Sequence, residues 1–378
     1  MKILTVIGAR PQIIKASAIS RAIKKYYNQQ INEVIVHTGQ HYDVNMSSVF
    51  FDELEIPQPN YNLNVGSGMH GEQTAKMIQG IEAIIQSESP DYLLVYGDTN
   101  STLAGAIAAS KLHIPVVHIE AGLRSYNKLM PEEINRILTD HCSTYLFPPT
   151  ASGLNNLLKE GFNDTNTKPY SMDHPLVKNM GDVMLDNTLY FSQLAEQKSD
   201  IINTLDLKNQ SFVLCTIHRN DNTDNAFKLK EIIQALINIA DKYAIKIVLP
   251  IHPRTKKMIV NLDQQLLEKF TNNPLIKILE PVSFFDMMML EKYSNFIITD
   301  SGGVQKEAYF FQKPSVILRK ETEWVEIVDA QMAFLTDANC QEIIDAATLI
   351  LEGKIKNNVV EIFGDGNAAK NILNLLLQ

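Results

Sequence analysis

The chain has 378 residues, of which 45% are hydrophobic and 20% are charged, and its formal net charge is −9. This length exceeds one ordinary hydrophobic core and fits two domains of a soluble globular protein. The negative balance argues against general nucleic-acid binding, which needs clustered Lys and Arg. No stretch approaches the roughly 18 apolar residues of a membrane span, and the N-terminal apolar run is too short for a signal peptide.

The cysteines are the next constraint. Cys142, Cys215 and Cys340 are scattered and show no metal-ligand spacing. We therefore expect reduced thiols in a cytoplasmic protein, with no metal site and no membrane association.

The first half of the chain alternates short apolar runs with helical patterns. Strands are expected at 3–7, 33–37, 92–96 and 115–119, and helices at 13–23, 73–85 and 102–110. Such alternation is typical of a parallel sheet covered by helices.

The second half repeats this organisation after an irregular region at 161–179. Its expected strands are 212–216, 246–249, 276–279, 296–299 and 315–318. The sequence thus predicts two α/β domains, 1–170 and 171–365, followed by an amphipathic segment at 368–377. Two similar α/β halves also predict a ligand cleft between their strand edges.

The first candidate binding segment is Gly8-Ala9-Arg10-Pro11-Gln12-Ile13-Ile14-Lys15, which follows a strand and opens a helix. A helix N-terminus with Arg10 and Lys15 beside it suits an anion such as pyrophosphate. An ordinary turn with exposed cations explains the same residues equally well. The segment has neither a Walker nor a Gly-x-Gly-x-x-Gly pattern.

Carboxylates follow the next two strands of this half. Asp98 stands in Tyr96-Gly97-Asp98-Thr99, where it either caps a helix or joins a site. Glu120 ends an apolar strand, at the sheet edge where α/β proteins bind ligands. Glu132 and Glu133 begin a helix after Pro131, and a dipole interaction or a Glu132–Arg136 pair would explain them without chemistry. Convergence of Arg10, Asp98 and Glu120 favours acid–base function.

The second half carries its own strand-end groups. His218 and His252 each follow a strand, and we interpret His218 as functional and His252 as structural. In Asp300-Ser301-Gly302-Gly303-Val304-Gln305-Lys306-Glu307, bare backbone amides precede a helix and can surround a phosphate, while Glu307 can accept ribose hydroxyl protons. This motif implies a nucleoside diphosphate ligand.

Together these motifs resemble the non-hydrolysing UDP-N-acetylglucosamine 2-epimerase family over essentially the whole chain. Those that carry the resemblance are Gly-Ala-Arg-Pro, His-Thr-Gly-Gln-His at 37–41, Gly-Asp-Thr at 97–99, His-Ile-Glu-Ala-Gly-Leu-Arg at 118–124, Pro-Glu-Glu-Ile-Asn-Arg, Thr-Ile-His-Arg, Asp-Ser-Gly-Gly-Val-Gln-Lys-Glu and Phe-Gly-Asp-Gly at 363–366.

The resemblance implies two Rossmann-like domains of glycosyltransferase-B architecture, with the C-terminal helix, 366–378, returning to the first domain. It also implies a homodimer that acts on a UDP-sugar without a cofactor. The implied reaction removes the C2 proton, eliminates UDP to leave a glycal, and then returns UDP and a proton from the other face. UDP would bind the second domain and the sugar would face the first.

The resemblance also implies roles for individual residues. It assigns catalysis to Asp98, Glu120, Glu132 and His218, and leaves open which carboxylate removes the proton. Substrate contacts fall on Arg10, Lys15, Ser301, Gly302, Gly303 and Glu307.

Several positions depart from the common family pattern. Gln12 replaces Glu, Asn220-Asp221 replaces Arg-Glu, Tyr42 replaces an Arg of substrate-activated members, and Trp324 replaces Arg, which suggests stacking on uracil. Some of these features resemble UDP-2,3-diacetamido-2,3-dideoxy-glucuronate 2-epimerases, and loss of a carboxylate at Gln12 would suit that anionic sugar. UDP-N-acetylglucosamine is the first expected substrate, the diacetamidouronate is the second, and a hydrolysing epimerase or a glycosyltransferase is the remaining alternative.

Overall fold

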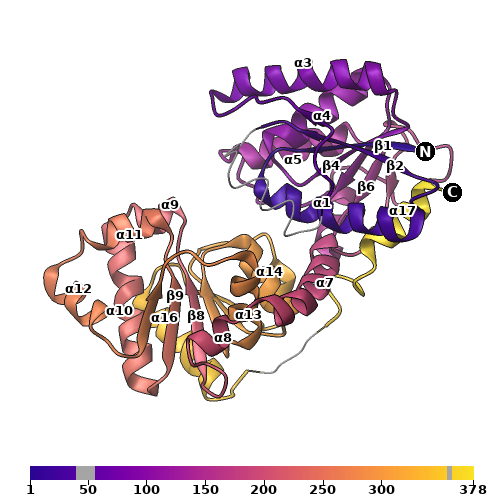
Figure 1. Cartoon of the computed structure of the whole chain (residues 1–378). Helices are drawn as coiled ribbons and strands as arrows, with labels where there is room; N and C mark the ends of the chain where they lie inside the picture. The colour runs from indigo at the N-terminus through magenta and orange to yellow at the C-terminus, as the bar shows by residue number, and fades with distance from the viewer. Residues whose placement is uncertain (40–55, 356–359) are drawn as a thin grey trace. The chain divides into compact units, whose positions relative to one another are not determined.

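The computed structural model describes residues 1–39, 56–355 and 360–378, which form two compact units (Figure 1). Unit 1 comprises 1–189 and 361–378, and unit 2 comprises 190–360. The division falls inside helix α7, so residues 171–189, which were expected in the second domain, lie in unit 1.

Unit 1 is built on a seven-stranded parallel sheet of order β3-β2-β1-β4-β5-β6-β7. Its strands are β1 Lys2–Ile7, β2 Asn32–His37, β3 Tyr61–Asn62, β4 Tyr92–Tyr96, β5 Val116–Ile119, β6 Tyr145–Phe147 and β7 Leu176–Val177. Its helices are α1 Arg10–Ala22 with a π-helical turn at Ile23–Tyr27, α3 His70–Glu88, α4 Asn100–Lys111, α5 Pro131–His141, α6 Ala151–Lys159, the first part of α7 Val183–Lys198, and α17 Ala368–Leu376.

Helices cover both faces of this sheet, with α3 and α4 on one face and α1 and α17 on the other (Figure 1). Side chains alternate along each strand, so Leu4 and Val6 of β1 pack with Met77 and Ile81 of α3 in one buried cluster. Such packing on both faces is what a parallel sheet requires.

The C-terminal helix α17 belongs to unit 1, as the family resemblance implied. The Asp186 carboxylate accepts hydrogen bonds from the backbone N–H groups of Ala368 and Ala369, at 3.1 and 2.8 Å. It therefore satisfies donors that the start of α17 would otherwise leave unpaired. Tyr27 donates a 2.6 Å hydrogen bond to Asn374, which joins the end of the α1 segment to α17.

Unit 2 contains a six-stranded parallel sheet of order β10-β9-β8-β11-β12-β13. The strands are β8 Phe212–Thr216, β9 Lys246–Pro250, β10 Ile276–Leu279, β11 Phe296–Thr299, β12 Ser315–Ile317 and β13 Ala333–Leu335. The helices are α8 Ile201–Thr204, α9 Asn220–Thr223, α10 Ala226–Tyr243, α11 Pro253–Ile259, α12 Gln264–Thr271, α13 Phe284–Tyr293, α14 Gly302–Phe310, α15 Val325–Asp329 and α16 Cys340–Leu351.

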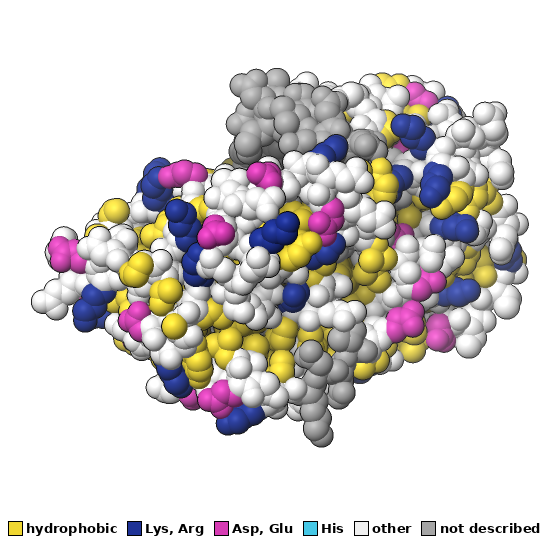
Figure 2. All heavy atoms as spheres, turned by 60° about the horizontal axis from the view of Figure 1, so that its bottom comes forward, with side chains coloured by type: hydrophobic (Ala, Val, Ile, Leu, Met, Phe, Trp, Pro, Cys, Tyr) yellow, Lys and Arg dark blue, Asp and Glu magenta, His cyan; other side chains and the backbone are white. Residues whose placement is uncertain are grey.

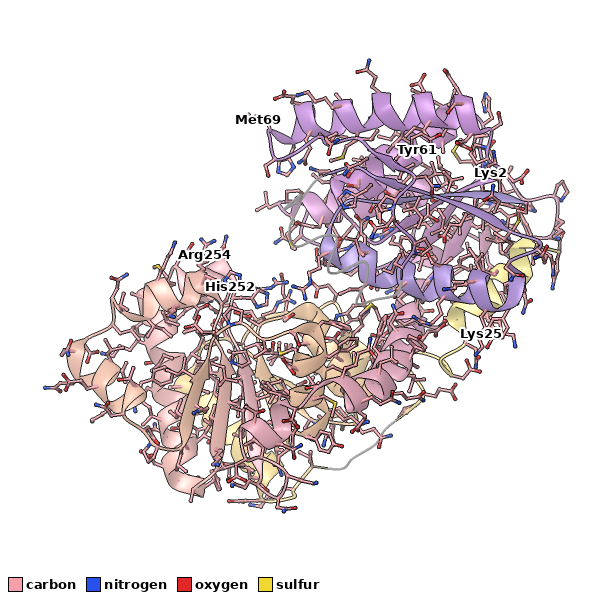
Figure 3. The ribbon with its side chains drawn as sticks, viewed as in Figure 1. Lys2, Lys25, Tyr61, Met69, His252 and Arg254 are labelled. Carbon is pink, nitrogen blue, oxygen red and sulfur yellow. The ribbon has the colours of Figure 1, made fainter. Side chains whose placement is uncertain are left out.

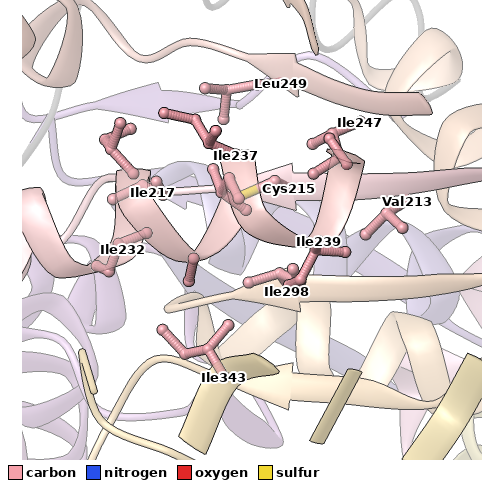
Figure 4. Packing of buried hydrophobic residues seen from close by; sticks show 14 of the residues in the cluster. Val213, Cys215, Ile217, Ile232, Ile237, Ile239, Ile247, Leu249, Ile298 and Ile343 are labelled. Carbon is pink, nitrogen blue, oxygen red and sulfur yellow. The ribbon is translucent and has the colours of Figure 1, made fainter. Parts of the chain in front are cut away.

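The main core of unit 2 lies on one face of its sheet. Val213 and Cys215 of β8 pack with Ile232 of α10, and Ile343 of α16 joins the same cluster (Figure 4). The alternate residues Phe212 and Leu214 form a second cluster with α13 and α14 on the opposite face. Two doubly wound sheets confirm the prediction of two Rossmann-like domains.

Candidate active site

In each unit, predicted site residues lie where the strand order of the sheet reverses. Strand order reverses between β1 and β4 in unit 1 and between β8 and β11 in unit 2. Connections leave in opposite directions at such a point, and the carboxyl ends of the two strands open onto a crevice. Arg10 and Asp98 follow β1 and β4, while His218 and Asp300 follow β8 and β11.

Asp98 takes part in an ion pair and does not cap the helix that follows it. The cap of α4 is Thr99, whose side chain accepts a hydrogen bond from Thr102 N–H. The carboxylate of Asp98 lies 2.5 Å from the guanidinium of Arg136 on α5. Burial raises the pKa of Asp98 above its ordinary value, although Arg136 and Lys15 oppose that shift. This environment suits a group that exchanges a proton.

Glu120 lies directly after β5 and is joined to the start of α1. Its carboxylate contacts the ammonium of Lys15, and both side chains are largely buried. Its φ of 71° is in the left-handed region, which costs a residue other than glycine about 1–3 kcal/mol. A Cβ on Gly97 would lie 3.1 Å from Lys15 Nζ and 3.2 Å from Glu120 Oε2, so glycine leaves room for the pair. Strain of this kind often accompanies a functional side chain.

Glu132 and Glu133 have different environments although they are adjacent. Glu132 is exposed at the start of α5, and its charge helps to raise the pKa of Asp98. Glu133 is buried, accepts hydrogen bonds from the N–H groups of Ser125 and Tyr126, and lies 3.0 Å from Arg136. Glu133 thus holds the loop before α5, as the structural interpretation predicted.

A buried polar chain supports the loop around Asp98 and Glu120. His118 Nε2 lies 2.8 Å from the carbonyl oxygen of Gly97, and His118 Nδ1 lies 2.7 Å from Asp140. Asp140 also lies 2.7 Å from Arg124 and accepts a hydrogen bond from Gly122 N–H. Burial opposes ionisation of Asp140, but His118 and Arg124 outweigh it and lower its pKa. These contacts connect the ends of β4, β5 and α5.

Arg10 is exposed at the first position of α1, whereas Gln12 is buried beneath it. Gln12 accepts hydrogen bonds from the N–H groups of Gly8 and Ala9. Its amide donates to the carbonyl of Tyr96 at 3.0 Å and to the hydroxyl of Thr102 at 2.9 Å. Gln12 therefore joins the turns after β1 and β4, and these contacts account for a glutamine here without reference to the sugar.

In unit 2, Asp300 holds the segment that carries His218. The buried Asp300 carboxylate accepts hydrogen bonds from His218 N–H, Arg219 N–H and Asn222 Nδ2, and lies 3.1 Å from His218 Nδ1. Burial acts against ionisation, but His218 and the N–H donors lower the pKa of Asp300. The ring of His218 stays partly exposed, with its Nδ1 edge fixed by a carboxylate.

His252 has a structural position at the start of α11. Its side chain accepts a hydrogen bond from Arg254 N–H and so caps that helix. Both residues are labelled in Figure 3. Its ring centroid is 6.3 Å from that of His218. Burial and the neighbouring His218 and Arg254 charges lower the pKa of His252.

The start of α14 contains the glycine turn. Ser301 caps the helix by accepting a hydrogen bond from Val304 N–H, so the first two amides, those of Gly302 and Gly303, have no partner inside the helix. Neither glycine has a positive φ, and an added Cβ would find no atom closer than 3.8 Å. The fold itself does not require glycine at these positions, which favours close approach of a ligand to the backbone.

Glu307 lies one turn further along α14 and contacts a second carboxyl group. The buried Glu291 of α13 shares a hydrogen bond with it. Burial and the Glu307 charge raise the pKa of Glu291 well above its ordinary value. A neutral Glu291 can therefore donate to Glu307 and fix its carboxylate.

Trp324 lies behind this turn and does not present a stacking surface. Its side chain is only 5% exposed, and its indole N–H donates to the carbonyl of Gly302 at 3.0 Å. Stacking on uracil, considered from the sequence, does not fit this position. Gln40, His41 and Tyr42 lie outside the described residues.

The sequence did not predict the contacts that Arg136 and Asp300 make at the candidate site. The sequence suggested Arg136 as a partner of Glu132, whereas the structure pairs it with Asp98 and Glu133. Asp300 appeared only as the first residue of the glycine motif. A carboxylate directly after a buried strand was the available signal for Asp300.

The described part of the chain contains no cluster of three or more His, Cys, Asp or Glu side chains arranged to hold a metal. Across the same residues, no helix is both long and apolar enough to span a bilayer. On the face shown in Figure 2, basic and acidic side chains are interspersed.

Comparisons with known proteins agree with the motifs. The family model described as UDP-N-acetylglucosamine 2-epimerase matches residues 24–377. The UDP-2,3-diacetamido-2,3-dideoxy-D-glucuronate 2-epimerase of Pseudomonas aeruginosa is 46% identical over 100% of this chain and 99% of its own length. The UDP-N-acetylglucosamine 2-epimerase of Methanocaldococcus jannaschii is 43% identical with the same coverage.

Solved structures give the same result. The crystal structure of the Methanocaldococcus jannaschii enzyme in complex with UDP-GlcNAc and UDP superimposes with a TM-score of 0.84 at 42% identity, and covers 100% of this chain and 99% of that one. The Neisseria meningitidis enzyme bound to UDP-GlcNAc has a TM-score of 0.84 at 30% identity and covers both chains completely. The chain therefore belongs to the UDP-N-acetylglucosamine 2-epimerase family of isomerases.

Proposed function

We propose that the protein interconverts UDP-N-acetylglucosamine and UDP-N-acetylmannosamine for cell-surface polysaccharide synthesis. A base removes the C2 proton, the C1–O bond breaks, and UDP leaves with the bonding electrons to give a glycal. UDP then adds back to C1 while an acid protonates C2 from the opposite face. No electrons are exchanged with a cofactor.

The acid–base cluster in unit 1 is the observation that carries this proposal. Asp98 and Glu120 lie at the ends of adjacent strands, and the charges of both Glu120 and Glu132 act on the pKa of Asp98. Asp98 thus has both cationic and carboxylate neighbours that act on its pKa. We assign the proton transfers at C2 to Asp98, Glu120 and Glu132, and the organisation of that site to Lys15 and Arg136.

The nucleotide is assigned to unit 2. The amides of Gly302 and Gly303 suit the diphosphate, with Ser301 beside them, and Glu307 suits the ribose hydroxyls. We assign to His218, whose Nδ1 lies 3.1 Å from Asp300, the proton transfer to the departing UDP oxygen. Arg10 adds positive charge at the start of α1, where a helix N-terminus also favours an anion.

Deuterium incorporation is the decisive test. The protein is incubated with UDP-N-acetylglucosamine in deuterated water and followed by NMR. A second UDP-sugar that carries deuterium at C2 is expected. Free sugar would instead indicate hydrolysis, and transfer to an added acceptor without C2 exchange would indicate a glycosyltransferase.

The diacetamidouronate is a second candidate substrate, because the Pseudomonas aeruginosa relative named for it is 46% identical to this chain. Both UDP-sugars are compared in the same exchange assay. Exchange in the diacetamidouronate alone would move the substrate assignment to that sugar.

The nucleotide half is tested by Gly302→Ala and Gly303→Ala. A methyl group there meets only ordinary contacts, so the stability should change by less than about 1 kcal/mol. UDP affinity should fall at least about tenfold, because the methyl occupies the space of the phosphate. Gly71→Ala, in an open position at the start of α3, is the matched control. Unchanged UDP affinity in both variants would refute the assignment of the diphosphate.

Two copies of the chain are proposed to associate through α5. This helix buries polar residues such as Asn135 and Asp140, whereas Ile134 and Leu138 are 45% and 44% exposed. Light scattering should report a dimer, and Ile134→Asp with Leu138→Asp should give a monomer. A monomeric unmodified protein would refute this association.

A cytoplasmic location belongs to the same proposal, supported by the three unpaired cysteines.

A further inference from the structure

The loop after β12 is attached to the start of α14 at two places. Thr322 donates a 2.6 Å hydrogen bond to the side chain of Gln305 and accepts one from Trp324 N–H at 3.1 Å. The Trp324 indole N–H then donates to the carbonyl of Gly302 at 3.0 Å. The hydrogen bonds to Gln305 and Gly302 both end on the first turn of α14.

One cation lies over the indole ring, and a buried ion pair lies next to Gly302. The ammonium of Lys306 lies 4.3 Å from the ring centroid, and Lys306 itself is buried. Arg319 and Glu323 form a buried ion pair, with hydrogen bonds of 3.0 and 2.9 Å, next to Gly302. A cation over an indole face is attracted to it, most strongly where water is excluded. Rotation of the ring would break the contact with Lys306 and the hydrogen bond to Gly302 together.

The Gly302 carbonyl, which accepts the hydrogen bond from the indole N–H, connects Trp324 to the proposed phosphate site. The carbonyl of Gly302 and the N–H of Gly303 belong to one rigid peptide plane. Fixing the carbonyl therefore fixes the direction in which the Gly303 N–H points. A hydrogen bond to the carbonyl also polarises the plane and strengthens that N–H as a donor.

We propose that Trp324 is a positioning residue that aims the Gly303 amide at the diphosphate through its indole N–H, with Lys306 holding the ring. This inference rests on the proposed binding of UDP at α14. It assigns to Trp324 a role in phosphate binding that does not involve contact with uracil.

Trp324 is the only tryptophan in the chain, which permits an atom-level test. Growth of a tryptophan auxotroph on benzothienylalanine replaces the indole N–H by sulfur and preserves the ring. Fluorotryptophan, which retains the N–H, is the matched control. UDP and uridine binding are measured by calorimetry, and circular dichroism checks that the proteins fold.

UDP affinity should fall about 3- to 10-fold in the benzothienylalanine protein, which is the effect of losing one hydrogen bond. Uridine affinity and the fluorotryptophan control should not change, because uridine has no phosphate. Tryptophan fluorescence of the unmodified protein should shift on addition of UDP and not on addition of uridine. Trp324→Phe provides an independent variant with the same expected selectivity.

Unchanged UDP affinity after loss of the N–H would overturn the positioning role, and so would equal weakening of UDP and uridine, which indicates a structural role only. If the unmodified protein binds no UDP, the proposed function itself fails. The two failures are therefore distinguishable.

Discussion

Lys15 and Glu120, 105 positions apart, form an ion pair that joins the start of α1 to the end of β5. The side chains are 14% and 8% exposed, so each charge depends on the other for compensation. This pair brings the first strand-to-helix turn, whose function was ambiguous in the sequence, into the same cluster as the catalytic candidates.

Loss of one partner of this pair should be costly. Lys15→Met should destabilise the protein by about 3 kcal/mol in urea unfolding, because it removes the ammonium that the buried carboxylate of Glu120 contacts. The double variant Lys15→Met/Glu120→Gln should be less destabilised than the sum of the single variants. Lys76→Met, which removes an exposed pair with Glu72, should change stability by at most about 0.5 kcal/mol. Additive effects at Lys15 and Glu120 would argue against the coupling.

Arg136 should set the pH dependence of turnover through Asp98. Asp98→Asn should slow epimerisation about 10²- to 10⁴-fold, which is the usual contribution of a general acid or base. Arg136 lowers the pKa of Asp98 in opposition to burial, so Arg136→Met should raise that pKa further and move the inflection of the rate profile to higher pH. Lys256→Met, which removes an exposed cation beside Glu280, should leave the profile unchanged. An inflection that stays in place or moves to lower pH in Arg136→Met would contradict the pairing.

Gln12→Glu should destabilise the protein and make its stability depend on pH. A carboxylate cannot donate to Tyr96 and Thr102, and the lost hydrogen bonds should cost about 1–3 kcal/mol. Burial would raise the pKa of the new carboxyl. The loss of stability relative to the unmodified protein should therefore be small below the pKa of this group in the unfolded chain, and it should grow as the pH rises through the pKa in the folded protein. Thermal melts at mildly acidic and mildly alkaline pH measure this difference, with the exposed Gln79→Glu as control. A deficit independent of pH would exclude this explanation.

Glu291 should control UDP affinity through Glu307. Because burial and Glu307 raise its pKa, Glu291 is the neutral donor at low pH and becomes charged as the pH rises through that raised value. UDP affinity should fall over the same pH interval. Glu291→Gln should retain affinity within about 3-fold and lose this pH dependence, whereas Glu291→Leu should weaken binding about tenfold. Calorimetry measures the UDP affinity of the unmodified protein and of both variants. Equal affinity in the Gln and Leu variants would rule out Glu291 as a hydrogen-bond donor.

Much of the fold and the site position could be predicted because both depend on local patterns. Buried parallel strands are short apolar runs, and predicted strands such as 92–96, 212–216 and 296–299 coincide with β4, β8 and β11. The carboxyl ends of such strands lie at the ligand-binding edge of the sheet, which is why the sequence pointed to Asp98, Glu120 and His218 as candidates.

The partners of these residues could not be predicted in the same way. Arg136 reaches Asp98 across 38 positions, and Gln12 reaches Tyr96 across 84. Such contacts depend on how α5 and α1 pack on the sheet, which no local pattern specifies. Trp324 shows the same limit, because its burial results from the packing of a loop against α14.

The C-terminal segment of unit 1, residues 361–378, has a consequence for biosynthesis. Unit 2 is one continuous stretch, 190–360, so all of it has been translated before residues 361–378 leave the ribosome. Unit 1 has to wait for α17, which supplies the buried Ile372 and Leu373 and receives the Asp186 cap. Nascent chains that stop near residue 360 should therefore expose an apolar surface on α1 that a chaperone can recognise, and unit 1 should mature last although its strands are made first.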